Sequence, residues 1–231
     1  MNKKILLVTT VLTLGMVLVA CSNTNINGIY ISTENPNVVL TIQNGNWEET
    51  DYDGSQFVRG TYTISGNNYT PVITHLYGHS LHITLEPRWY TKEEIIESGL
   101  IHENYTAVIN AVNTLTYSTS RYDFIISSPD RGTFIYARKP EGRITGSITG
   151  AWTGQIDGID INTSITNIGW TLSIPETNIS ETGTYEWDAA HNHGRLSADS
   201  SGGIFIGTIE LLNNNYLLVS IDYDTFVLAR Q

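Results

Sequence analysis

The sequence predicts an all-β protein with two tandem copies of one small antiparallel unit, the first carrying a short helical insertion. Three observations support this. Short apolar and β-branched runs alternate with Gly- and Asn-rich turns along most of the chain. Three short phrases recur in the same order in its two halves. Only 15% of the 231 residues are charged, and the single cysteine excludes a disulfide scaffold and a cysteine-based zinc site.

Residues 1–20 are predicted to be a lipoprotein signal peptide. Lys3 and Lys4 provide a cationic start, and an uncharged run over 5–20 follows. That run is shorter than the about 20 apolar residues that a membrane-spanning helix needs, and its form is typical of an export signal. The alternatives are an uncleaved anchor and an ordinary signal peptide with a chance cysteine.

The end of this run, Leu-Val-Ala-Cys over 18–21, resembles the lipobox of bacterial lipoproteins. The resemblance implies cleavage between Ala20 and Cys21 and attachment of a diacylglycerol to the Cys21 thiol. Residues 21–27 would then be a lipidated tether, and the acylated Cys21 would insert into the lipid bilayer. Ser22 stands where an aspartate would favour inner-membrane retention, so we expect the outer membrane of the cell envelope.

The formal net charge of -11 restricts the possible partners. Nucleic-acid binding is not expected, because it needs a basic surface that displaces counterions from phosphates. An acidic protein is also repelled by anionic lipid headgroups, so a lipid chain rather than a basic patch must hold this one at a membrane.

The repeated phrases divide the chain into a first copy over 28–139, a linker over 140–148 and a second copy over 149–231. The matching pairs are Gly28-Ile29-Tyr30 with Gly150-Ala151-Trp152, Gly60-Thr61-Tyr62 with Gly183-Thr184-Tyr185, and residues 133–138 with 225–230. The members of the last pair lie closer together than those of the first two. The first copy therefore holds additional residues between its middle and its end.

Both copies are predicted to form antiparallel strands. In the second copy, apolar runs over 204–211, 216–221 and 225–230 are separated by Asn- and Asp-rich turns. In the first copy, residues 38–42 lead into Asn-Gly-Asn at 44–46, which is a hairpin signal. Short strands with turns at this spacing are typical of an up-and-down barrel or a sandwich.

The additional segment of the first copy, near 91–112, is predicted to be helical. Thr91 and Glu94 have the spacing of a capping box. An apolar stripe with helical spacing follows, formed by Tyr105, Val108, Ile109 and Val112. The two short helices would either close one end of the sheet structure or act as a lid over a pocket.

The first and last strands of each copy resemble those of the calycin superfamily, which includes the lipocalins. In that family a Gly-X-Trp on the first strand packs under an arginine from the last strand. The matching residues are Gly28, Tyr30 and Arg138 in the first copy, and Gly150, Trp152 and Arg230 in the second. The resemblance implies two tandem small antiparallel up-and-down β-barrels.

The layout is also similar to small lipocalin-like lipoproteins of spirochaetes, through the strand over 60–67 and the segment over 89–94. The second copy is shorter than an ordinary calycin. We therefore expect its interior to be filled by its own side chains.

Two groups of histidines are candidate metal ligands: His75, His79 and His82, and the pair His191 and His193. The pair could share one face of a strand and clasp a metal. However, Tyr77-Gly78, Asn192 and Gly194 indicate turns, and no carboxylate is placed to complete a ligand set. We expect neither a metal site nor a cofactor.

The acidic run after the first hairpin is interpreted as a solvated turn. It consists of Glu48, Glu49, Asp51 and Asp53, with Gly54 after it. It lacks the residue order of a calcium-binding loop.

These features predict a membrane-anchored lipoprotein of the cell envelope that acts as a non-enzymatic binding or surface-interaction module. No nucleophile elbow, phosphate loop or zinc-protease motif is present. One alternative is a carrier of a small apolar ligand in a lipocalin-like pocket of the first copy, beneath the helices. Another is an envelope hydrolase that uses His75 or His79 with a nearby carboxylate.

Overall fold

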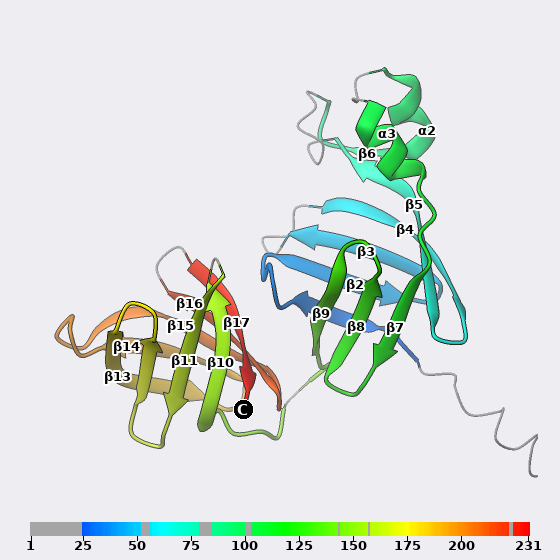
Figure 1. Cartoon of the computed structure of the whole chain (residues 1–231). Helices are drawn as coiled ribbons and strands as arrows, with labels where there is room; N and C mark the ends of the chain where they lie inside the picture. Colours follow the sequence, from blue (N-terminus) through cyan, green and yellow to red (C-terminus); the bar gives the residue numbers. More distant parts are fainter. Residues whose placement is uncertain are drawn as a thin grey trace, which may run out of the picture.

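Two closed, eight-stranded antiparallel barrels lie side by side in this protein (Figure 1). The computed structural model describes residues 25–51, 56–78, 85–99, 103–142, 144–156, 158–221 and 224–231. The prediction of an all-β chain with two small up-and-down barrels and short helices in the first is confirmed. The expected signal peptide and Cys21 lie outside the described residues.

The first barrel is a ring of sequential strands in which the last strand pairs with the first. Its strands are β1 (Gly28–Ser32), β2 (Val38–Gln43), β3 (Asn46–Asp51), β4 (Gln56–Ser65), β5 (Asn68–Tyr77), β7 (Leu115–Thr119), β8 (Asp123–Ser128) and β9 (Gly132–Lys139). The predicted hairpin joins β2 to β3. Asn44 and Gly45 adopt φ angles of 50° and 84° there, a left-handed backbone that glycine and asparagine tolerate.

The second barrel has the same ring order with no inserted element. Its strands are β10 (Gly150–Ile156), β11 (Ile159–Ile165), β12 (Trp170–Ile174), β13 (Ile179–Asp188), β14 (His193–Ala198), β15 (Ile204–Asn213), β16 (Tyr216–Ile221) and β17 (Asp224–Arg230). Strand β17 returns to pair with β10 and closes the ring.

The two barrels differ most where β5 meets β7. These strands pair only at Asn68↔Thr116 and Tyr69↔Leu115, whereas the corresponding β14 and β15 pair from His193↔Glu210 to Ala198↔Ile204. Residues 78–114 separate β5 from β7, whereas the short turn 199–203 joins β14 to β15. Because of the insertion, most of β5 is not paired with β7 in the first barrel.

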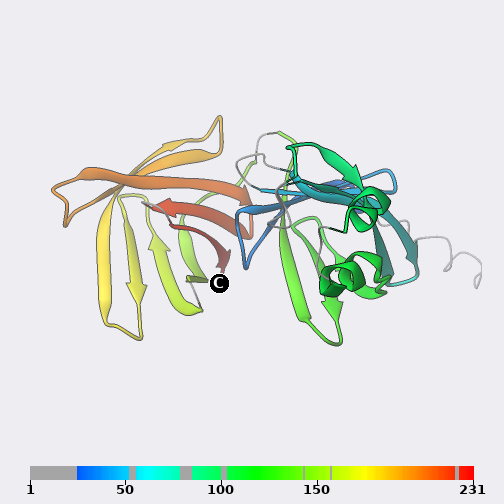
Figure 2. The same cartoon turned by 90° about the horizontal axis from the view of Figure 1, so that it is seen from above.

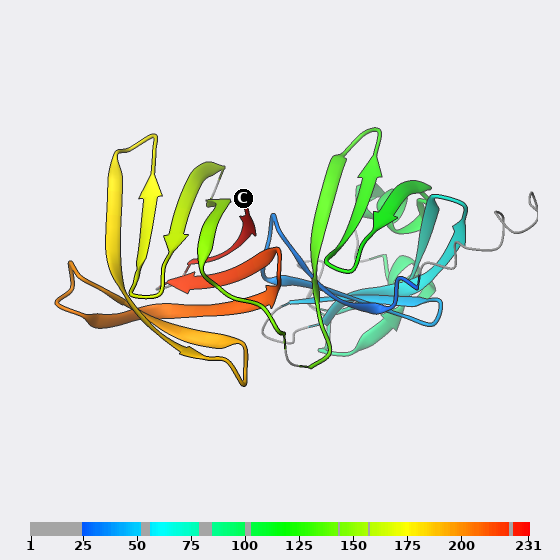
Figure 3. The same ribbon diagram turned by 90° about the horizontal axis from the view of Figure 1, so that it is seen from below.

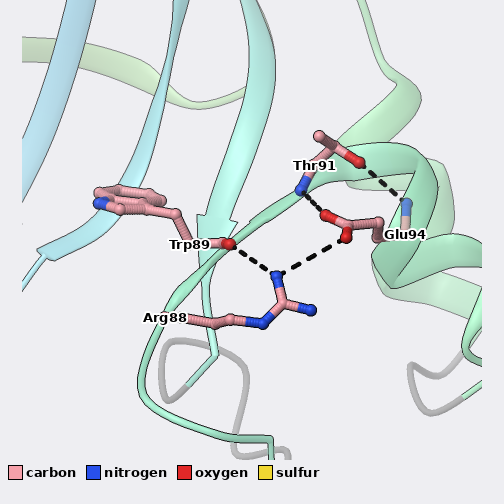
Figure 4. A network of polar contacts seen from close by, with 4 residues as sticks. All are labelled: Arg88, Trp89, Thr91 and Glu94. Carbon is pink, nitrogen blue, oxygen red and sulfur yellow. Dashed lines mark hydrogen bonds and ion pairs between the residues drawn. The ribbon is translucent and has the colours of Figure 1, made fainter.

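The inserted segment contains β6 (Trp89–Thr91), which pairs with the far end of β5, and two helices, α2 (Lys92–Glu97) and α3 (Glu103–Asn110). The predicted capping box is confirmed: the Thr91 hydroxyl accepts from the Glu94 backbone N–H, and the Glu94 carboxylate accepts from that of Thr91 (Figure 4). Arg88 adds an ion pair to Glu94 at 3.6 Å and donates to the Trp89 carbonyl. This network sets where α2 begins.

The helices pack on the outside of the first barrel, away from the second barrel (Figure 2). Their contact is an apolar cluster of Leu76, Tyr90, Ile95 and Ile109. The predicted apolar stripe is partly wrong. Ile109 is buried, but Val108 is 47% exposed and Val112 lies beyond the end of α3. One side of α3 therefore packs on this cluster, and another side lies beside the gap between β5 and β7.

An apolar cluster joins the two barrels, which lie against each other in a third view (Figure 3). Its buried members are Ile31, Ala137, Leu212, Leu218 and Val227. The side-chain amide of Asn213 donates to the backbone oxygens of Tyr122 and Arg138, and Lys139 pairs with Glu210 at 2.8 Å. Apolar burial and these polar contacts hold the barrels together.

Candidate functional site

The residues of the second calycin-like pattern meet at one end of their barrel. The Arg230 guanidinium lies 4.1 Å from the ring centroid of Trp152. It donates to the backbone oxygens of Asn214 and Thr149, at 2.7 and 2.8 Å, and to that of Ser147. The Trp152 indole N–H donates to the Ile148 oxygen. The cation is thus satisfied by backbone groups and an aromatic face, which is a structural role.

The first copy repeats this arrangement more loosely. Arg138 lies 5.7 Å from the ring centroid of Tyr30 and donates to the Asn27 oxygen, while the Tyr30 hydroxyl donates to Ile26. Gly28 and Gly150 lie directly beside the arginines. A Cβ at these positions would approach Arg138 Nε to 3.1 Å and Arg230 Nη1 to 2.8 Å. A side chain at either position would therefore push on the guanidinium, and Gly150 also has a φ of 142°, which side chains rarely allow.

The interior of the second barrel is filled by side chains. One buried cluster spans all the strands except β13, whose Tyr185 and Trp187 pack against it. Its members are Ile148, Trp152, Ile161, Ile165, Trp170, Leu196, Ala198, Ile209, Leu211, Leu217, Val219, Phe226 and Leu228. This is the packing expected of a small barrel.

Aromatic rings fill only part of the first barrel. Phe124 lies at their centre, 5.5 Å from both Tyr30 and Tyr69 between ring centroids. Tyr117 and Tyr136 also contact it, at 6.0 and 6.5 Å. These tilted and edge-on ring contacts form the closely packed end of the first barrel's core.

A cavity of about 290 Å³ lies beside this aromatic cluster, where β5 and β7 part and the end of α3 approaches. Its lining is Leu40, Trp47, Glu49, Tyr69, Pro71, Ile73, Val108, Ala111, Asn113, Leu115, Ile126, Ser127, Ser128, Arg131, Phe134 and Tyr136. Most of these side chains are apolar or aromatic. Such a surface with a few polar groups is typical of a small-molecule site.

The carboxyl of Glu49 is the acidic group of this lining. Burial raises the pKa of Glu49. Burial also raises the pKa of Tyr69 and of Tyr136, and the negative charge of Glu49 adds to both shifts. The two phenols therefore stay protonated and can act as donors or acceptors beside the carboxyl.

The interpretation of the acidic run as a solvated turn is wrong for Glu48, Glu49 and Asp51, which lie within β3. The internal repeat could have revealed this. Trp47 donates to the Thr61 oxygen just as Trp170 donates to that of Thr184, both at 3.0 Å. Two residues further along, Glu49 takes the place that Leu172 has in the second copy, on the inward face. Asp53 lies outside the described residues.

Glu49→Gln is expected to raise the stability of the protein at about pH 7, with a gain that shrinks as the pH falls towards about 4. The folded-state pKa of Glu49 is raised, so ionisation opposes folding, and this cost disappears once the carboxyl is protonated. Thermal unfolding across this pH range measures the effect. Glu48→Gln, on the opposite face of β3, is the control and should show no such gain. A loss of stability in Glu49→Gln at neutral pH contradicts the assignment.

The described histidines, His75, His191 and His193, do not gather into a metal-binding group. His75 Nδ1 lies 3.0 Å from the hydroxyl of the neighbouring Thr74. His191 Nδ1 lies 2.6 Å from Asp188 Oδ2 in an exposed turn, and His193 opens β14. His79 and His82 lie outside the described residues. Within the described ranges, no three His, Cys, Asp or Glu residues gather closely enough to hold a metal.

Among the helices that the structure describes, none has the length and apolar character needed to span a membrane. No family model, curated protein or solved structure matches this chain. The function is therefore inferred from the geometry and chemistry of the cavity.

Proposed function

We propose that this chain is a membrane-anchored, non-enzymatic protein that binds a small, largely apolar molecule in the cavity of its first barrel. The observation that carries the proposal is the contrast between the two barrels. One copy packs its interior with side chains, whereas the other keeps a cavity of about 290 Å³ lined by aromatic and aliphatic groups. A partly enclosed apolar pocket with a few polar groups is the kind of surface that small molecules bind, so its presence in one copy alone favours a ligand there.

The volume limits the ligand to a molecule of about one or two rings. An apolar cavity of roughly 150 Å³ holds benzene, and drug-sized ligands use pockets of roughly 300–1,000 Å³. The cavity therefore lies at the small end of that range. The polar groups Glu49 and Tyr136 replace Leu172 and Leu228 of the second copy, which provides the few polar contacts that orient a ligand.

Titration of the purified protein with naphthalene tests this proposal, by calorimetry, with one site per chain as the expected result. Ala111 lies at the mouth of the cavity, and Ala111→Trp should reduce the affinity by about tenfold or more. Ala107→Trp is the matched control, because Ala107 is an exposed alanine on α3 outside the lining. Equal binding by both variants, or no binding by the wild type, overturns the proposal.

The proposed anchor is the acylated Cys21. The Leu-Val-Ala-Cys box supports it, and so does the net charge of -11, which disfavours purely electrostatic attachment to anionic lipid. The two barrels with their arginine–aromatic contacts favour kinship with lipocalin-like lipoproteins. Ser22 after the cysteine favours the outer membrane as the location.

Cys21→Ser is expected to move the protein from the membrane fraction to the soluble fraction, because it removes the thiol that accepts the lipid. Fractionation of cells that express each form, with detection of the second barrel by antibody, measures this. Ser22→Ala keeps the thiol and should stay with the membrane. Membrane retention of Cys21→Ser refutes the anchor and leaves the proposed binding site untouched.

A further inference from the structure

The cavity holds a negative charge that the protein itself does not neutralise. Within the described part of the chain, the Glu49 carboxylate belongs to none of the salt bridges, which join Arg88 to Glu94, Lys139 to Glu210 and His191 to Asp188. Arg131 also lines the cavity, but it lies in the exposed turn between β8 and β9. A half-buried carboxylate is costly unless a cation pairs with it.

The groups around Glu49 are those that attract a positive charge. Trp47, Tyr69, Phe134 and Tyr136 line the same cavity. Aromatic faces bind ammonium groups through their quadrupole, and the contact strengthens when water is excluded. The phenol oxygens of Tyr69 and Tyr136 can also accept hydrogen bonds from an N–H donor. Carboxylate and rings thus form a binding set for an organic cation.

The repeat shows that the fold does not need this acid. The corresponding residue of the second copy is Leu172, which packs against the apolar core of its barrel. Leucine at this position is compatible with the same strand, the same tryptophan and the same ring of strands. The construction of the barrel therefore does not require an acid at this position.

We infer that the ligand of the first barrel is an organic cation, a protonated amine or quaternary ammonium group on a body of one or two rings, with Glu49 as its counter-ion. The inference rests on the proposed function and adds the chemical class of the ligand. The ammonium group pairs with Glu49 between the aromatic faces, and the apolar body fills the space towards Ile126 and Leu115.

Calorimetry with three probes of matched size tests the inference: 2-phenylethylamine, the neutral 2-phenylethanol and the anionic 3-phenylpropanoate. The wild type should bind the amine at least about tenfold more tightly than the alcohol, and the acid most weakly. Glu49→Gln should erase the preference for the amine over the alcohol. Glu48→Gln should retain the wild-type preference, and Glu49→Asp, which keeps the charge, should retain part of it.

The pH dependence is a second readout that needs no variant. The amine preference should fall as the pH drops through the pKa of Glu49, which burial raises. The other titratable groups of the lining are Tyr69, Tyr136 and Arg131, and burial raises the pKa of both phenols, so they stay neutral in this range. Glu49 is thus the lining group that titrates.

The outcomes separate the two proposals. If the wild type binds the alcohol as tightly as the amine, the inference is wrong and the proposed function stands. If the amine preference survives Glu49→Gln, Glu49 is not the counter-ion and the inference is also wrong. If none of the three probes binds but naphthalene does, the inference alone is wrong; if naphthalene does not bind either, the proposed function fails together with the inference.

Discussion

Replacement of Trp152 by alanine is expected to lower the unfolding free energy of the second barrel by about 3–5 kcal/mol. Trp152 is 0% exposed and is one of the largest side chains of the barrel core. Its loss leaves a cavity, removes the aromatic face under Arg230 and leaves the Ile148 oxygen without its indole donor. The one substitution therefore destabilises the barrel in three ways.

Hydrogen exchange of the β10 and β17 amides is the appropriate measurement. The two barrels share an apolar cluster, so a global melting curve would mix their transitions. Ile168→Ala is the control: Ile168 is 87% exposed, and its change should stay within about 0.5 kcal/mol. A loss below about 1 kcal/mol in Trp152→Ala would show that the arginine–tryptophan contact is not central to the barrel.

Gly183→Ala is expected to cost about 3 kcal/mol, at the upper end of what overpacking costs in a closed structure. An added Cβ would lie 1.9 Å from the Ser197 oxygen and 2.8 Å from the indole nitrogen of Trp170. The first contact is with backbone, so β13 and β14 would have to separate. The same clash occurs at Gly60, where the added Cβ would lie 1.9 Å from the Val72 oxygen.

Chemical denaturation of both variants measures these costs, with Thr184→Ala as the control. Thr184 is the exposed neighbour of Gly183 on β13, and its change should cost less than about 1 kcal/mol. Gly60→Ala should also weaken ligand binding, because Trp47 packs against this glycine and lines the cavity. If both glycine variants are as stable as the control, the close approach of the strands is contradicted.

The repeated Trp and Gly positions show how the two copies differ. Trp47 and Trp170 contact the equivalent glycines and donate to equivalent carbonyls, so the framework of the barrels is the same. The copies diverge at Glu49 against Leu172 and at the inserted segment over 78–114. One copy is a packed barrel, and in the other the ring is closed between β5 and β7 by only two residue pairs.

The signals that were readable in the sequence are local. The hairpin at Asn44-Gly45 and the capping box of Thr91 and Glu94 each depend on a few neighbouring residues. The repeated phrases are each short as well, and their order can be compared along the chain without any structure. Turn geometry, helix capping and strand alternation are fixed by neighbours in the chain, so the all-β class, the duplication and the helical insertion were predicted correctly.

The cavity was decided only by the tertiary structure. The alternation of side chains along β3 predicts that Trp47 and Glu49 lie on the same face of the strand. It does not predict which face points into the barrel. The void also depends on β5 and β7 parting beyond Tyr69 and Leu115, which is a non-local event. From the sequence alone, an acidic run is therefore predicted to be exposed to solvent. The burial of the Glu49 carboxyl results from closure of the barrel and not from its residue type.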